Sequence, residues 1–290
     1  MPFPVIDAHQ HVWDLDRARY DWLDARLAPI DRSIDLGEAL PEMAACGVDA
    51  TILVQAADNA EDTAVMRRAA AAHREVVAIV GYAPLEDPAA TARTIDAWRG
   101  DPLLVGVRNL IHDRADPDWI LQPAVDESLG LLEDAGLAFD LVSVLPRHLE
   151  LAPILSERHP RLRIVIDHLS KPPIGLDAVE PWWGAIAVAA ENPLTHAKVS
   201  GLYSATADPA AWTTEAIRPF FDRALDVFGP ERLMYGGDWP ISVTAGGYRR
   251  VWEGLAPLFD ALPATDRESV LGRTAARFYR VDPARLAAHD

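Results

Sequence analysis

Two histidines near the start of the chain, His9 and His11, follow the apolar residues 3–6 and are separated by one residue. Successive side chains of a β-strand point to opposite faces, so residues two apart share a face. A strand here would therefore direct both imidazoles into one pocket. Because neutral imidazole binds metal ions and carries protons near neutral pH, the pair predicts a cation site or a proton-transfer site. The alternative is two unrelated surface histidines.

Two later apolar segments also change abruptly into polar residues. Residues 164–166 are followed by Asp167 and His168, and residues 233–235 are followed by two glycines and Asp238. The glycines permit a tight backbone turn that would place the carboxylate at the end of a strand. Considered singly, His168 could form a hydrogen bond with the backbone of a loop, and Asp238 could cap the turn that follows it. Taken with the first pair, both are predicted site residues.

Three imidazoles and one carboxylate meeting at one place would form a nitrogen and oxygen site. Such a set suits one divalent, zinc-like ion and leaves room for a water molecule. Asp238 would ligate the ion, take a proton from that water, or do both. The prediction requires that His9, His11, His168 and Asp238 come together from distant parts of the chain.

Short segments rich in valine and isoleucine alternate with longer alanine-rich segments whose apolar residues recur every three or four positions. This alternation predicts repeated strand and helix units. Eight strands are predicted, at residues 5–9, 51–56, 76–82, 104–110, 138–144, 163–168, 195–200 and 232–236. Helices are predicted between and after them, at residues 36–45, 60–73, 89–98, 122–135, 147–159, 179–190, 215–228, 248–261 and 264–279.

Eight such units within 290 residues predict an α/β fold, a (β/α)8 TIM barrel, as a single domain over residues 1–290. The longest loop, residues 12–35, carries aromatic residues that could cover the mouth of the barrel. An open doubly wound sheet is the rival architecture, but its Gly-x-Gly-x-x-Gly fingerprint is absent after the first strand. In a barrel, active sites lie at the C-terminal ends of the strands, where the polar residues above are found.

The composition restricts the partners and the location. The chain carries 27 basic and 44 acidic residues, a net charge of −17, with no basic stripe, so no nucleic-acid or membrane partner is expected.

The single cysteine, Cys46, excludes an internal disulfide and is expected to be a packed thiol. No signal peptide and no apolar run of ~20 residues is seen, so a cytoplasmic location is expected. The sequence leaves both a monomer and a homo-oligomer open.

Seven segments together resemble a known family, the sugar-lactonase branch of the amidohydrolase superfamily. They are residues 7–14 (Asp-Ala-His-Gln-His-Val-Trp-Asp), 20–23, 106–108, 167–172, 198–202, 237–240 (Gly-Asp-Trp-Pro) and 274–279. The resemblance covers nearly the whole chain. It implies a hydrolase barrel with His9 and His11 on the first strand, His168 farther round and Asp238 on the last.

The resemblance also exposes a departure from the superfamily. Its binuclear members carry a bridging lysine on the fourth or fifth strand, where this chain has Arg108 and Asp140, and Lys198 comes too late. A two-metal centre is therefore not expected. Some members of the branch work without a tightly held metal, so the histidines could instead donate hydrogen bonds to the substrate carbonyl.

The resulting hypothesis is that the chain opens a sugar lactone of the L-fuconolactone type to the aldonic acid, a step in carbohydrate catabolism. Asp238 would act as general base and His168 would help to stabilise the oxyanion. Further residues beyond strand ends are expected to bind the substrate, namely Arg108, Asp140, His112, Lys171, Tyr203 and Trp239. Arg108 offers fixed donors and Asp140 accepts from hydroxyls.

Two other functions remain open on the sequence. One is a metal-dependent decarboxylase of the same superfamily, and the other is a non-catalytic barrel that binds sugar acids. A serine hydrolase is disfavoured because no Gly-x-Ser-x-Gly segment occurs.

Overall fold

Eight parallel strands pair in chain order, and each overlaps one of the predicted strands. The computed structural model describes residues 3–206, 208 and 211–287. The strands are β1 (Ile6–Gln10), β2 (Ala50–Val54), β3 (Val76–Gly81), β4 (Leu104–Arg108), β5 (Ala138–Leu141), β6 (Arg163–Ile166), β7 (Thr195–Val199) and β8 (Leu233–Tyr235). Seven of them end one to three residues before the predicted end.

The first and last strands meet and close the barrel. Gln10 forms a parallel bridge with Trp239, and the backbone N–H of Asp238 donates to the carbonyl of His9 at 2.8 Å. The pairing of β1 with β2 shifts its register between Asp7 and Gln10. Irregularities of this kind re-aim side chains beside active sites, and this one includes His9.

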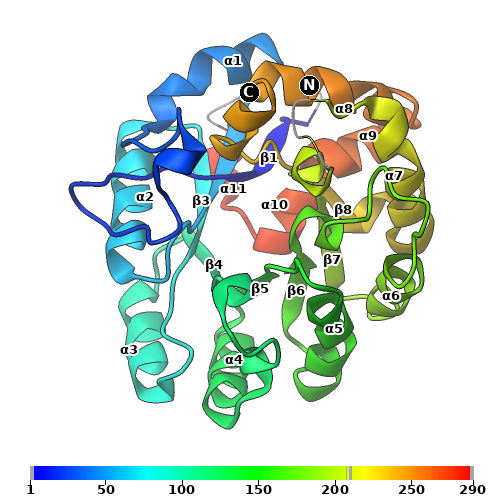
Figure 1. The fold of residues 1–290 in the computed structure, drawn as a ribbon. Helices are drawn as coiled ribbons and strands as arrows, with labels where there is room; N and C mark the ends of the chain where they lie inside the picture. Colours follow the sequence, from blue (N-terminus) through cyan, green and yellow to red (C-terminus); the bar gives the residue numbers. More distant parts are fainter. Residues whose placement is uncertain (1–2, 207, 209–210, 288–290) are drawn as a thin grey trace.

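Most of the helices form an outer ring around the strands, whereas the last two, at residues 274–279 and 283–286, lie across the middle of the view (Figure 1). The helices are α1 (Leu40–Ala45), α2 (Ala60–Ala72), α3 (Pro88–Trp98), α4 (Pro123–Ala135), α5 (Pro146–Arg158), α6 (Trp182–Ala189), α7 (Thr214–Phe228), α8 (Tyr248–Asp260), α9 (Ala264–Glu268), α10 (Thr274–Tyr279) and α11 (Pro283–Leu286). The single helix predicted at residues 264–279 is interrupted by a π-helical segment, Ser269–Arg273, between α9 and α10. None of the described helices has both the length and the apolar composition needed to cross a membrane. The (β/α)8 prediction is confirmed.

Two apolar clusters hold these layers together. The larger packs the helices against the strands, and it includes Leu53, Phe139 and Tyr235. The smaller includes Ile52 and Val165 and packs against the α10 aromatic residues. The predicted alternation of apolar strands and amphipathic helices is what both clusters require, because each strand is buried on two faces.

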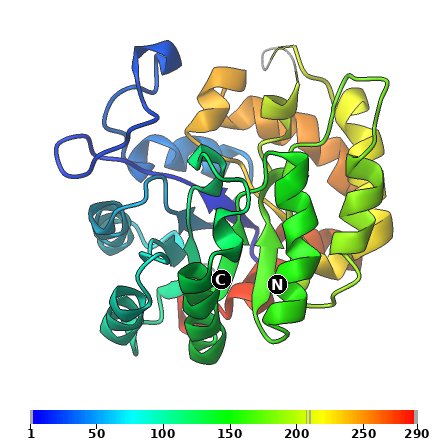
Figure 2. The ribbon, with the colours of Figure 1, turned by 60° about the horizontal axis from the view of Figure 1, so that its bottom comes forward.

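The long loop after β1 lies at the barrel end towards which the strand arrows point (Figure 2). Its three aromatic residues have different positions. Trp13 and Tyr20 are buried, and the Tyr20 hydroxyl donates to Asp62 at 2.8 Å. Trp22 is partly buried, and its indole N–H donates to the carbonyl of Ala56 at 2.6 Å. The anchored loop thus brings Trp22 to the barrel mouth.

A buried histidine in the barrel wall predicts a loss of stability in acid. His196 on β7 packs its ring 4.6 Å from that of Phe278, and burial lowers its pKa from 6.5 to about 4. As the pH falls below 6.5, the unfolded chain binds a proton at this histidine, whereas the folded chain binds it only near pH 4. The free energy of unfolding therefore decreases as the pH falls from 6.5 to about 4. The expected contribution is about 3 kcal/mol.

The measurement is chemical unfolding of His196→Gln and of the unsubstituted protein at several pH values. At pH 7.5 the difference between them gives the packing cost alone. Between pH 6.5 and pH 4 the variant should lose less stability, and equal losses would contradict the prediction.

Candidate functional site

The four residues predicted to meet do meet, at the C-terminal end of the barrel. His9 lies one residue before the end of β1, His168 follows β6 and Asp238 follows β8, and one ligand atom from each of these three lies within 4.8 Å of the others. The ring of His9 lies 4.8 Å from that of His11 and 4.5 Å from that of His168. Nε2 of His11 lies 3.5 Å from Oδ1 of Asp238. All four residues are buried.

Glycines before Asp238 allow this close approach. A Cβ on Gly236 would lie 2.7 Å from Cβ of His9, and one on Gly237 would lie 2.5 Å from Oδ2 of Asp7. Asp238 itself has a left-handed backbone, with φ 54°. Residues in this conformation cost free energy and are found mainly where the surrounding structure holds them, often at active sites.

His168 begins a left-handed turn that is rare for residues other than glycine. The four residues from His168 to Lys171 have φ between 48° and 60°. Each costs roughly 1–2 kcal/mol relative to a right-handed conformation. The indole N–H of Trp182 donates to the carbonyl of Leu169 at 2.7 Å, which helps to hold the turn. The turn directs His168 inwards, where its Nδ1 lies 2.8 Å from the Ser200 hydroxyl.

The backbone of Gly201 lies close to the side chains of His168 and Asp238, which gives a testable prediction. Its φ is 55°, and an added Cβ would lie 2.6 Å from Oδ2 of Asp238 and 2.6 Å from Nδ1 of His168. Gly201→Ala should therefore displace the carboxylate and the imidazole and lower activity at least tenfold, since misplacement of about 1 Å can cost far more.

The matched control is Gly47→Ala, because Gly47 has φ 70° and no atom within 4 Å of the added Cβ. Both variants should lose about 1–2 kcal/mol of stability from the strained backbone. Only Gly201→Ala should lose activity, and retention of full activity would show that the contact is relieved without cost.

The electrostatic environment keeps Asp238 ionised and two of the imidazoles neutral. Burial favours a raised pKa for Asp238, but the neighbouring His168, His11 and His9 hold the pKa well below its usual value. Burial lowers the pKa of His168 to about 3 and lowers the pKa of His9 well below 6.5. At neutral pH the site thus presents a carboxylate beside neutral ring nitrogens.

The hydrogen bond of His11 determines which of its nitrogens faces the site. Its Nδ1 lies 2.7 Å from the carbonyl oxygen of Val54, which can only accept. Nδ1 therefore carries a proton, and a neutral ring presents the lone pair of Nε2 towards Asp238. This orientation suits a metal ligand.

A layer of four buried charged side chains lies inside the barrel next to His9 and contacts its ring. These are Arg108, Asp140, Asp167 and Lys198. Nζ of Lys198 lies 2.5 Å from Oδ2 of Asp140, 3.2 Å from Oδ1 of Asp167 and 3.1 Å from Nδ1 of His9. Nε of Arg108 lies 2.9 Å from Oδ2 of Asp167. Two cations thus face two carboxylates, which limits the cost of burying them. Burial raises the pKa of Asp140 to about 6 although Lys198 opposes this.

The catalytic candidates and several predicted binding residues line one small cavity, here called the inner cavity. Its volume is about 160 Å³. The lining includes His11, His168 and Asp238 together with the predicted binding residues Arg108, His112 and Lys171. Trp22 and Leu110 also contribute to its wall.

The other three predicted binding residues do not line the inner cavity. Asp140 is fully buried below it and accepts from the hydroxyl of Tyr279 at 2.8 Å. The Tyr203 hydroxyl donates to Oδ2 of Asp238 at 2.9 Å, and the carbonyl of Trp239 accepts from the N–H of His11 at 2.7 Å. The side-chain groups of Asp140 and Tyr203 are thus used inside the barrel, and Trp239 holds the backbone of His11.

Residues not predicted to act at the site also reach it. Asp167 and Lys198 form the charged layer, Ser200 contacts His168, and Trp22 lines the inner cavity. A signal for two of them was present, because Lys198 and Ser200 are polar and two apart on a strand that ends at the site. Trp22 belongs to the aromatic loop that was predicted to cover the barrel mouth, but its exact position depends on the path of that loop, which has no periodic signal.

The donor set fits a single divalent ion. His9, His168 and Asp238 offer two ring nitrogens and one carboxylate oxygen, with Nε2 of His11 beside them. Within the described part of the chain, the buried Nε2 of His9 has no hydrogen-bond partner. Nitrogen and oxygen ligands with an open position are the set that zinc uses in catalytic sites. Lys198 lies on β7, beyond the strands that carry a bridging lysine in binuclear sites.

Comparisons with known proteins find relatives over nearly the whole chain. The model of a family described as amidohydrolase matches residues 6–281. An L-fucono-1,5-lactonase of Burkholderia ambifaria is 36% identical over 96% of each chain, and one of Burkholderia multivorans is 32% identical over 94% of this chain and 95% of its own. A crystal structure of a Burkholderia multivorans amidohydrolase with bound zinc has a TM-score of 0.88 and 30% identity, covering 96% of this chain and all of that one.

Proposed function

The chain belongs to the amidohydrolase family, and from that premise we propose that it hydrolyses a sugar lactone to the open aldonic acid. The observation that carries the proposal is the meeting of the Asp238 carboxylate with three imidazoles, two of which line the inner cavity with it. The similarity to L-fucono-1,5-lactonases supports a neutral sugar lactone as the substrate class.

Asp238 is the proposed general base. Its ionised carboxylate takes a proton from water as the water oxygen attacks the ring carbonyl. When the tetrahedral intermediate collapses, the bond to the ring oxygen breaks and Asp238 returns the proton to the leaving alkoxide. The hydrogen bond from Tyr203 holds Oδ2 of Asp238, which leaves Oδ1 on the side of His11.

The histidines are proposed to stabilise the oxyanion that develops on the carbonyl oxygen. When the Ser200 hydroxyl donates to Nδ1 of His168, the other ring nitrogen carries a proton that it can donate. A donor of this kind can contribute about 3–4 kcal/mol in acyl-transfer chemistry. Lactones are reactive esters, so they need less assistance than amides.

His9, His11, His168 and Asp238 would hold a divalent ion if one is bound. Such an ion supplies positive charge that polarises a carbonyl group and acidifies water. Around it, Arg108, His112 and Lys171 are proposed to bind the hydroxyls of the sugar from the wall of the inner cavity. We also propose a cytoplasmic enzyme, in keeping with its single cysteine.

The test is a screen of stereoisomeric aldonolactones, including L-fucono-1,5-lactone, in weakly buffered solution with a pH indicator, with and without a chelator. We expect acid release well above the spontaneous rate. Gas evolution from aromatic acids would indicate the decarboxylase instead. Stabilisation of the fold by sugar acids without turnover of any lactone would indicate the non-catalytic barrel.

A further inference from the structure

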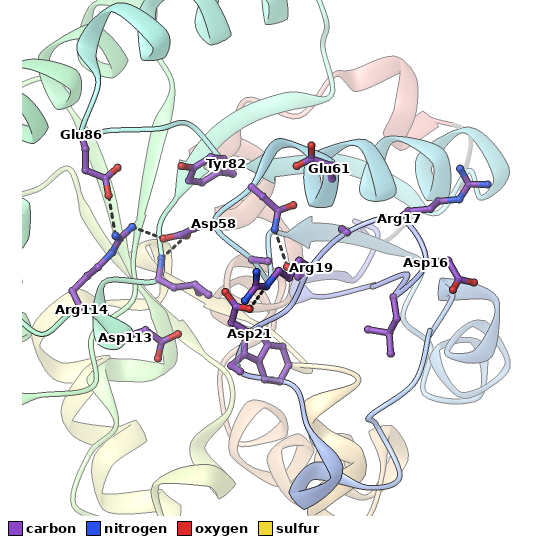
Figure 3. A pocket seen from close by; sticks show the side chains of 16 residues that line it. Asp16, Arg17, Arg19, Asp21, Asp58, Glu61, Tyr82, Glu86, Asp113 and Arg114 are labelled. Carbon is purple, nitrogen blue, oxygen red and sulfur yellow. Dashed lines mark hydrogen bonds and ion pairs between the residues drawn. The ribbon is translucent and has the colours of Figure 1, made fainter.

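A second, larger cavity adjoins the inner cavity and is here called the outer cavity. Its volume is about 910 Å³, and Trp22 and Leu110 line both cavities. The loop after β1 forms one side, and residues following β2, β3 and β4 form the other (Figure 3). A ligand in the inner cavity could therefore extend past Trp22 into the outer one.

The volumes indicate that the inner cavity holds only part of a larger ligand. Pockets for small molecules usually measure ~300–1,000 Å³. The inner cavity, at about 160 Å³, is below this range, whereas the outer cavity lies within it. One sugar lactone would fill the inner cavity, and a substituent on it would lie in the outer one.

The charges of the outer cavity disfavour an anionic substituent. Six carboxylates and three guanidinium groups line it. Arg114 is bound by Asp58 at 2.7 Å and by Glu86 at 2.9 Å, and Arg19 pairs with Asp21. The third, Arg17, pairs with Asp14 at 3.0 Å, so each guanidinium group is paired with a carboxylate; Figure 3 shows the pairs of Arg114 and Arg19. A phosphate or carboxylate would meet an excess of negative charge.

Other groups in the wall suit the hydroxyls and the apolar face of a sugar. Within residues 3–206, 208 and 211–287, the carboxylates of Asp16 and Glu61 and the hydroxyl of Tyr82 have no hydrogen-bond or ion-pair partner, so all three are available to a ligand. Trp22 is held by its bond to Ala56 and offers a fixed aromatic surface. Carboxylates accept from hydroxyls, and a tyrosine hydroxyl donates and accepts.

We propose that the outer cavity binds a second, neutral sugar residue that is joined to the lactone by a glycosidic bond. The inference rests on the proposed lactone hydrolysis and names its substrate class as glycosylated aldonolactones. The glycosidic bond stays intact, and only the ester bond of the lactone is opened. Trp22 lies at the junction of the two sugar positions.

The experiment compares D-glucono-1,5-lactone with cellobiono-1,5-lactone and maltobiono-1,5-lactone, which carry a glucosyl group on the same ring. The variants are Glu61→Gln and Tyr82→Phe, with Glu157→Gln, an exposed residue of α5, as control. We expect one glycosylated lactone to be hydrolysed with a kcat/KM at least equal to that of the monosaccharide. Each cavity variant should lower that value about tenfold through KM and leave the monosaccharide value unchanged.

Rejection of both glycosylated lactones while the monosaccharide is hydrolysed would overturn the inference, as would equal losses on lactones of both sizes. Titration calorimetry with cellobiose and maltose separates this failure from failure of the proposed function. If no lactone is opened, saturable binding that Glu61→Gln weakens about tenfold would still support the outer sugar site. Absence of both turnover and binding would remove both proposals.

Discussion

Asp238→Asn is expected to lower kcat for lactone hydrolysis by about 10²–10⁴-fold, the range of a positioned general base. Asparagine keeps the size of the side chain and can still accept the hydrogen bond from Tyr203, but it cannot take a proton from water. The loss should therefore appear in kcat. The indicator assay on purified protein measures it directly.

The matched control is Asp134→Asn, an exposed carboxylate on α4 that is remote from the inner cavity. It should retain the original rate. Thermal unfolding of Asp238→Asn shows whether the fold survives the substitution. Equal rates for Asp238→Asn and the unsubstituted protein would remove Asp238 from the mechanism.

Lys198→Met is expected to destabilise the fold by about 3–5 kcal/mol, because it leaves buried carboxylates without their cation. Lys198, Asp140 and Asp167 are all fully buried, and Arg108 would then be the remaining cation beside two negative charges. Methionine has a similar length, so the loss reports mainly the charge. Urea unfolding at pH 7 is the measurement.

A second substitution tests the cause of that loss. Asp140→Asn removes one of the buried negative charges that lose their cation in Lys198→Met, and its amide oxygen can still accept the hydrogen bond from Tyr279. The double variant Lys198→Met/Asp140→Asn should therefore be at least about 1 kcal/mol more stable than Lys198→Met alone, as coupled neighbours are not additive. A loss below about 1 kcal/mol for Lys198→Met would show that the carboxylates become protonated or hydrated at little cost.

The partial success of the sequence predictions has a physical explanation. Residues that end strands share one edge of a parallel barrel, so His9, His168 and Asp238 could be grouped without coordinates. Asp140 also lies near the end of a strand, yet its carboxylate pairs with Lys198 and does not line the inner cavity. Periodicity reports which residues are buried, but it does not report which buried charge finds which partner.

The left-handed turn at residues 168–171 is a second feature that local patterns do not reveal. Residues other than glycine favour right-handed or extended backbone conformations. Tertiary contacts, such as the hydrogen bond from Trp182 to Leu169, hold these four residues in the left-handed conformation. Similarly, the position of Trp22 at both cavities depends on contacts that anchor its loop, those of Trp13 and Tyr20 among them.

By itself the sequence determined the order of eight strands and their helices, the barrel, and the chemical types at the strand ends, because strand and helix periods and glycine turns are local properties. The tertiary structure alone decided which side chains face the inner cavity, which lie beneath it as paired charges, and that an outer cavity adjoins it. Those outcomes depend on distances between residues far apart in the chain, and these distances exist only once the barrel has closed.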